Sequence, residues 1–219
     1  MRKSDHVNLL FWGVLLPILG SVVSIEFFMD WRFEHLSAHM ALEILGSLAA
    51  FTILFIIYIS PRSLELEEGE LSFLTMALMA MGLLDAFHAM ALPGNNFVWL
   101  HSAATLAGGG FLALIWFSER PVPHVSQLFN VLIISVATLG IYSFVHPEVM
   151  PTMLDGGTFT IIARLMNIGG GIGFFLGAWY FYSRYRWFHR RGYYLLAAHC
   201  LLFGMAGILF EVSALWDLA

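Results

Sequence analysis

The sequence predicts an all-α polytopic membrane protein, a bundle of seven transmembrane helices, and two observations favour this fold class. Of the 219 residues, 59% are hydrophobic and 11% are charged, with a mean hydropathy of +0.80. Soluble domains carry about 25% charged residues. The apolar residues also form continuous runs of about the 20 residues that a helix needs to cross a bilayer, and their lack of alternation disfavours a β-barrel. The lipid bilayer is therefore the expected surrounding of this chain.

The runs predict spans at 7–29, 36–60, 71–92, 97–117, 125–145, 158–183 and 193–216. The first run follows Met1-Arg2-Lys3 but is too long for a signal peptide, and Glu26-Phe27-Phe28 is no small-residue cleavage site. We therefore expect this run to be a retained span.

The links between these runs are short. One of them holds the acidic run from Glu65 to Glu70, and others hold proline and glycine turn signals. None has room for a soluble catalytic or nucleic-acid-binding unit, so residues 1–219 are expected to form a single membrane domain that binds no nucleic acid. The single cysteine, Cys200, excludes an internal disulfide and a cysteine-based metal cluster.

Basic residues in the short loops predict the orientation in the cell inner (plasma) membrane. With seven spans, one side holds Arg32 alone, and the other holds Arg2, Lys3, Arg62, Arg120, Arg184, Arg186, Arg190 and Arg191. The amino terminus is thus expected to be cytoplasmic and the carboxyl terminus external.

Ionisable residues recur at helical spacing inside three of the predicted spans: His39 and Glu43, Asp85 and His88, and His101. Such groups are costly inside a bilayer and indicate a functional site. The helical rise places all five at a similar depth near the outer face, and the Pro93–Asn96 turn makes the spans that carry His88 and His101 antiparallel neighbours. We therefore expect these five residues to form one site.

Imidazole and carboxylate groups from neighbouring helices can hold a metal or cofactor. Zinc, copper or iron would suit this donor set, with Glu43 or Asp85 orienting a ligating histidine, and haem held by two of the three histidines is a further possibility. The alternative is that these groups only form hydrogen bonds between helices. His35, Arg164 and Glu211 are secondary candidates in the same layer, and Arg164 with Glu211 favours a structural ion pair.

Glycine runs form a second pattern, Gly108-Gly109-Gly110 in the fourth span and Gly169-Gly170-Gly171 in the sixth. Small residues let helix backbones approach closely in a membrane. The pattern predicts tight packing of these two spans, with a groove for a flat or long apolar ligand as the alternative.

The stretch from Leu84 to Met90, with His39 and Glu43 before it and Gly94 and Trp99 after it, resembles the membrane-associated sensor domains of the third type. These are multi-helix input domains of bacterial sensor histidine kinases and diguanylate cyclases. The resemblance covers residues 35–118. It implies a sensory or ligand-binding role, with His39, Glu43, Asp85 and His88 in the sensing site.

Three functions remain open. The first is a sensory module that binds a metal, haem or small ligand and signals to a partner protein or a second copy of the chain. The second is a metal-dependent membrane hydrolase, in which Glu43 or Asp85 would activate a metal-bound water. The third is a haem or copper subunit for electron transfer or transport. The first is favoured, which makes an enzymatic activity the less expected outcome.

The orientation gives a testable prediction. The residue Ala219 is expected to lie outside the cytoplasm, because an odd number of spans separates the two termini. Alkaline phosphatase fused after Ala219 should therefore be active, and a fluorescent protein fused there should not fluoresce in the cytoplasm. Fusions of alkaline phosphatase and of a fluorescent protein would measure this, and cytoplasmic fluorescence would contradict the predicted topology.

Overall fold

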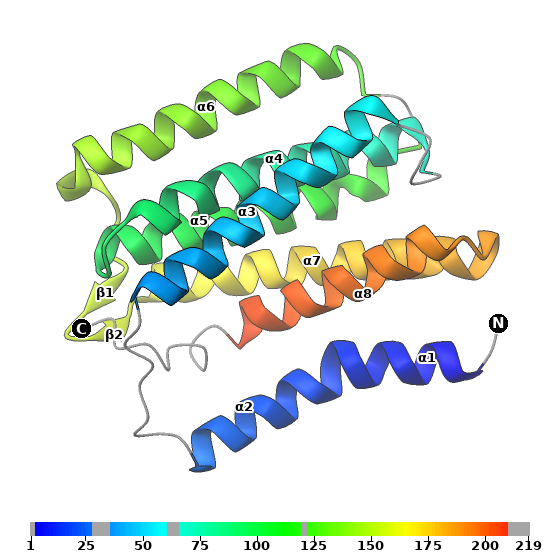
Figure 1. Ribbon diagram of the computed structural model, residues 1–219, viewed down its shortest axis with the longest axis horizontal. Coiled ribbons are helices and arrows are strands. Elements are labelled where there is room, and N and C mark those ends of the chain that lie inside the picture. Colours follow the sequence, from blue (N-terminus) through cyan, green and yellow to red (C-terminus); the bar gives the residue numbers. More distant parts are fainter. Residues whose placement is uncertain (1–2, 28–35, 61–65, 120–121, 210–219) are drawn as a thin grey trace.

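The computed structural model describes residues 3–27, 36–60, 66–119 and 122–209, which form helical rods lying side by side (Figure 1). The first rod combines α1 (Lys3–Leu10), a π-helical turn η1 (Phe11–Leu15) and α2 (Leu16–Phe27). The others are α3 (Leu36–Ile59), α4 (Glu68–Met90), α5 (Asn95–Ala113) with a 3₁₀ turn η3 (Leu114–Phe117), α6 (Val125–Val145), α7 (Ile161–Phe188) and α8 (Arg191–Ile208).

The lengths of these helices suit a bilayer. Five of them are long and apolar enough to cross a membrane: α3, α4, α5 with η3, α6 and α7. The 23 residues of α4 correspond to about 34 Å, which exceeds the roughly 30 Å of a hydrocarbon core. The first rod contains a shorter apolar stretch, Val7–Val23, and α8 has 18 residues. The predicted all-α polytopic membrane fold is confirmed, and the orientation of the termini stays a prediction.

The predicted start of the sixth span is wrong. We expected a helix from residue 158, but a 3₁₀ turn η4 (Pro147–Val149) and a small hairpin of β1 (Leu154–Asp155) and β2 (Thr158–Phe159) precede α7. Gly156 and Gly157 both have positive φ angles, 55° and 80°, as a two-residue hairpin turn needs. The Thr160 hydroxyl then accepts a hydrogen bond from the Ala163 N–H, so the helix begins at Ile161.

Helices α4, α5 and α7 form the centre of the bundle. Helices α3 and α6 pack on α4, α8 packs on α7, and the first rod contacts α8 through η1 (Figure 1). Burial follows this order, because half of the most apolar window of α4 is buried but only 17% of that of α3. Helix α3 therefore shows most of its surface to lipid, and its polar side chains need a partner on α4.

Glycines allow α5 and α7 to touch through their backbones. A Cβ atom added at Gly170 would lie 2.5 Å from the Thr105 carbonyl oxygen, and one added at Gly109 or Gly173 would collide with the backbone of the facing helix. The predicted tight packing of the two glycine runs is thus what the structure shows.

This contact predicts a difference between neighbouring glycines. Gly170→Ala is expected to destabilise the protein by about 1–3 kcal/mol, because the methyl group forces α5 and α7 apart. Gly110→Ala is the control, because nothing lies within 4 Å of its added Cβ and alanine favours a helix. Thermal unfolding in detergent would measure both, and equal stability of the two variants would contradict the proposed role of the contact.

A buried carboxylate joins α4 to α7 and α8 at the first turn of α4, the end of that helix opposite to His88. Glu70 is fully buried and accepts hydrogen bonds from the Tyr180 hydroxyl (2.7 Å), the Arg184 Nε–H (2.7 Å) and the Tyr193 hydroxyl (2.8 Å). Its second oxygen also accepts from the Glu67 backbone N–H, which caps α4. The predicted place of Glu70 in a link is wrong, because α4 begins at Glu68. Its partners on α7 and α8 lie more than 100 residues away in the sequence, so no local pattern indicates them.

The network predicts a large loss on truncation. Glu70→Ala is expected to destabilise the protein by about 2 kcal/mol or more, because three donors on α7 and α8 lose their acceptor and the half-buried Arg184 loses its counterion. Glu68→Ala is the matched control, because Glu68 is exposed on the same helical turn. Unfolding in a denaturing detergent would compare them, and a Glu70→Ala loss no larger than that of the control would be inconsistent with this network.

Candidate functional site

The candidate site lies between α3 and α4, near the end of the bundle where the α4–α5 turn and the hairpin lie. His39 and Glu43 are four residues apart on α3 and therefore share one face of that helix. Their facing atoms, His39 Nε2 and Glu43 Oε1, are 3.9 Å apart. Both side chains are largely shielded, with 15% and 25% of their surface exposed, although α3 as a whole is the more exposed helix.

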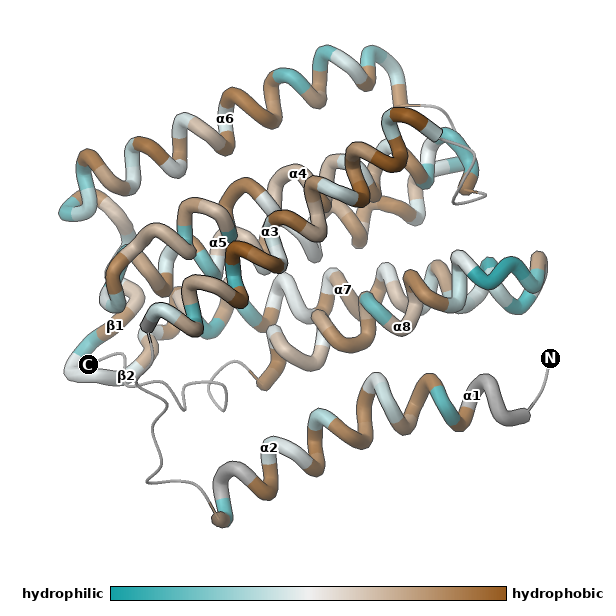
Figure 2. The backbone as a smooth tube through the Cα atoms, viewed as in Figure 1, coloured by the Kyte–Doolittle hydropathy of each residue, from teal (hydrophilic) through white to brown (hydrophobic). Residues whose placement is uncertain are grey.

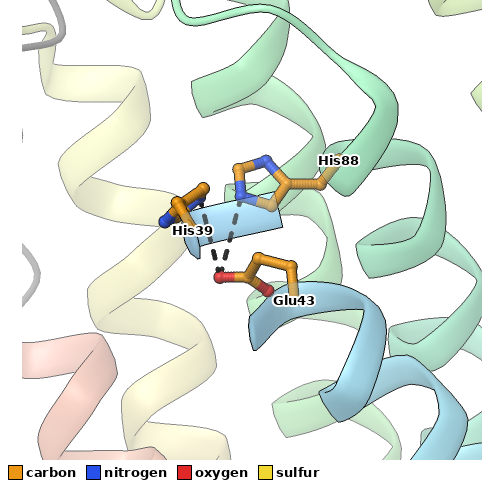
Figure 3. A group of neighbouring side chains, drawn as sticks. All are labelled: His39, Glu43 and His88. Carbon is orange, nitrogen blue, oxygen red and sulfur yellow. Dashed lines mark ion pairs between the residues drawn. The ribbon is translucent and has the colours of Figure 1, made fainter. Parts of the chain in front are cut away.

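His88 comes from the last turn of α4 and completes the group. Its side chain is 1% exposed, and its Nε2 lies 3.9 Å from the same Glu43 Oε1 atom. His39 and His88 meet edge to face, with their ring centroids 5.6 Å apart. One carboxylate oxygen of α3 thus lies between two imidazoles from different helices (Figure 3).

A backbone carbonyl sets the tautomer of the neutral His88 ring. His88 Nδ1 lies 2.9 Å from the Phe97 carbonyl oxygen, which can only accept a hydrogen bond. Nδ1 therefore donates to this carbonyl, and in the neutral ring the lone pair belongs to Nε2, the nitrogen that lies 3.9 Å from Glu43 Oε1. Metal-binding histidines are commonly oriented in this way, because the hydrogen bond of one nitrogen sets the tautomer and makes the other the better donor.

The short α4–α5 turn brings Phe97 to His88. Helix α4 ends at Met90, Gly94 takes a positive φ angle of 142°, and α5 begins at Asn95, so that Phe97 lies in its first turn. The Phe97 ring packs on both histidines, with centroids 4.0 Å from His88 and 5.1 Å from His39. The Phe97 ring covers one side of the site, and the Phe97 carbonyl orients the His88 ring.

The structure brings together three of the five predicted residues as potential metal ligands. One ligand atom each of His39, Glu43 and His88 lies within 4.8 Å of the others. His101 on α5 is next to this group, with its ring centroid 5.1 Å from that of His88. Asp85, one turn before His88 on α4, interacts electrostatically with Glu43. The predicted convergence of α3, α4 and α5 is thus observed, with His101 and Asp85 beside the group of three.

Of the secondary candidates, the structure describes Arg164 alone. Arg164 is on the first turn of α7, where its side chain is exposed. His35 and Glu211 lie outside the described residues, so the predicted pair of Arg164 with Glu211 stays a prediction.

Sequence reasoning missed the role of Asn95. Its side chain donates to the Pro151 carbonyl oxygen (2.9 Å) and accepts from the Met153 backbone N–H (2.6 Å). It thereby fastens the segment before the hairpin to the first turn of α5, beside the site. No local pattern indicates this contact, because the partners are more than 50 residues away and are backbone atoms.

Of three comparisons with known proteins, one gives a match. No curated protein and no solved structure matches it. The sequence profile of a family described as membrane-associated sensor domain, MASE3, matches residues 31–215 and extends the resemblance far beyond residues 35–118. This match confirms the expected family and covers most of the helical bundle. The chain therefore belongs to the membrane-associated sensor domain family.

Proposed function

We propose that this membrane sensory domain binds a divalent transition-metal ion through His39, Glu43 and His88 and signals its occupancy to a partner. The observation that carries the proposal is the convergence of two imidazole nitrogens and one carboxylate oxygen within 4.8 Å. The hydrogen bond from His88 to the Phe97 carbonyl supports it, because it leaves the inward-facing nitrogen ready to donate its lone pair.

The geometry suits an ion after a small contraction. In a tetrahedral zinc site with bonds of about 2.0–2.2 Å, two ligand atoms lie about 3.4 Å apart. The two carboxylate–imidazole separations are 3.9 Å and all three ligand atoms lie within 4.8 Å of one another, so side-chain movements of about 0.5–1.4 Å would close the site. Two histidines and one carboxylate are the protein ligands of zinc sites with an open position and of non-haem iron(II) sites, and these two metals are the favoured occupants.

The packing of the two imidazoles favours an ion over haem. A porphyrin ligated by His39 and His88 would have to lie between their rings. The rings instead contact each other edge to face, and Phe97 packs on both of them. An ion needs only the small volume between the three donor atoms, which lie within 4.8 Å of one another.

Sensing would follow from where the ligands originate. Helix α3 supplies two of them and α4 supplies the third, so a bound ion would join a lipid-exposed helix to the centre of the bundle. Occupancy would thus favour one arrangement of α3 against α4, and a ligand shifts a conformational equilibrium only through such a difference. We propose that a partner protein or a second copy of the chain reads this arrangement.

The proposal predicts selective loss of metal binding. Glu43→Gln and His88→Ala are each expected to weaken zinc or iron(II) binding at least 100-fold, because each removes one of three ligands. His189→Ala is the control, because His189 is an exposed residue at the end of α7. Metal content of the purified protein and competition with a chelator of known affinity would measure the effect.

Retention of stoichiometric metal in both site variants, with helical content unchanged, would refute the metal site. A Soret absorption band in the purified protein that is lost with His88→Ala would instead identify haem as the occupant. Equal metal loss in His189→Ala would show that the binding resides elsewhere in the chain.

A further inference from the structure

Positive charge accumulates where α7 ends and α8 begins. Arg184, Arg186, Arg190 and Arg191 lie within eight residues, and no acidic residue occurs between Asp155 and Glu211. Figure 2 shows this end of α7 and α8 as hydrophilic, in contrast to the apolar middle of both helices. The cluster lies at the limit of a membrane-spanning helix, at the depth of lipid headgroups.

The arginines of this cluster differ in their partners. Arg184 is neutralised by Glu70, at 2.7 Å, and its guanidinium lies over the Phe188 ring. Arg186 is two residues further along α7, is exposed, and forms no ion pair with any other residue that the structure describes. Among the described residues, nothing therefore neutralises the charge of Arg186.

Arg186 lines a pocket of about 250 Å³ together with Ser183 and Trp187. The three residues lie at helical spacing on one face of α7, and Trp187 leaves 81% of its surface exposed. They offer a guanidinium, a hydroxyl and an indole N–H, which are hydrogen-bond donors, and they include no carboxylate. A pocket of this kind complements an anion with several acceptor oxygens.

The partial charges at the ends of α7 and α8 do not cancel the preference of the pocket for an anion. The C-terminal end of α7 carries a partial negative charge, but the N-terminal end of α8 begins at Arg191 and carries a partial positive one. The arginine side chains therefore set the sign of the local potential.

We infer that the pocket of Ser183, Arg186 and Trp187 binds the phosphate group of an anionic phospholipid. Arg186 would hold two phosphate oxygens, as guanidinium groups do, with Ser183 donating a further hydrogen bond. The exposed Trp187 ring would lie among the lipid headgroups, where tryptophan is enriched in membrane proteins. Clusters of four or more lysine or arginine residues on the cytoplasmic side of a membrane-spanning helix attract anionic lipids, and the sequence predicts that this end faces the cytoplasm.

Lipid titration of the purified full chain tests this inference. In neutral detergent, phosphatidylglycerol or phosphatidylcholine would be added and the bound lipid counted by native mass spectrometry. Arg186→Gln is expected to weaken phosphatidylglycerol binding about tenfold, because a charge-assisted pair is lost. Arg191→Gln is the matched control, since it removes the same charge from an exposed position outside the pocket, and it should change binding less than about threefold.

The outcomes separate the sources of the phosphate group. Preferential phosphatidylglycerol binding that Arg186→Gln weakens and Arg191→Gln preserves supports the lipid site. Equal binding of inorganic phosphate, with the same dependence on Arg186, would assign the pocket to a soluble phosphate anion and overturn the lipid assignment. Equal losses in the two variants, or no preference for phosphatidylglycerol over phosphatidylcholine, would overturn the inference altogether.

Discussion

The backbone contact between α5 and α7 is the constraint on which the rest of the bundle depends. Because Gly109, Gly170 and Gly173 have no side chains, the two helices approach until the backbone of each contacts that of the other. In a membrane, packing of this kind replaces the hydrophobic effect, because lipid is as apolar as the helix surfaces. It creates a rigid centre on which α4 and α8 pack, and α3 and α6 pack in turn on α4.

Helix α4 carries a buried polar side chain near each end. Glu70 is bound by donors of α7 and α8, and His88 is bound by a carbonyl of α5 and faces Glu43 of α3. His88 is 18 positions after Glu70, which corresponds to about 27 Å along the helix. A polar group without a partner is costly in an apolar medium, so both ends of α4 are held in position by strongly favoured contacts. The helix spans the distance between the candidate site and the opposite end of the bundle.

Local sequence patterns predict part of this structure and leave long-range partners undetermined. Apolar runs predict the bounds of α3 to α6 within about three residues, and the spacing of His39 and Glu43 predicts their shared face. The depth argument also brings His88 to them. The carbonyl of Phe97 as a partner of His88 could not be predicted, because it depends on the exact path of the α4–α5 turn. Glu70 is part of an acidic run that the sequence predicts to be a link, because Tyr180, Arg184 and Tyr193 contact it only in three dimensions. The hairpin after α6 has strands of two residues, too short for any periodicity.

Asn95 connects the segment before the hairpin to the first turn of α5 through two hydrogen bonds. One amide side chain bonds the backbone of Pro151 and Met153, and the carbonyl that orients His88 belongs to Phe97, two residues after Asn95. The segment before the hairpin is therefore connected to the His88 imidazole through the first turn of α5. A displacement of the loop between α6 and α7 would thus also displace the carbonyl that orients His88.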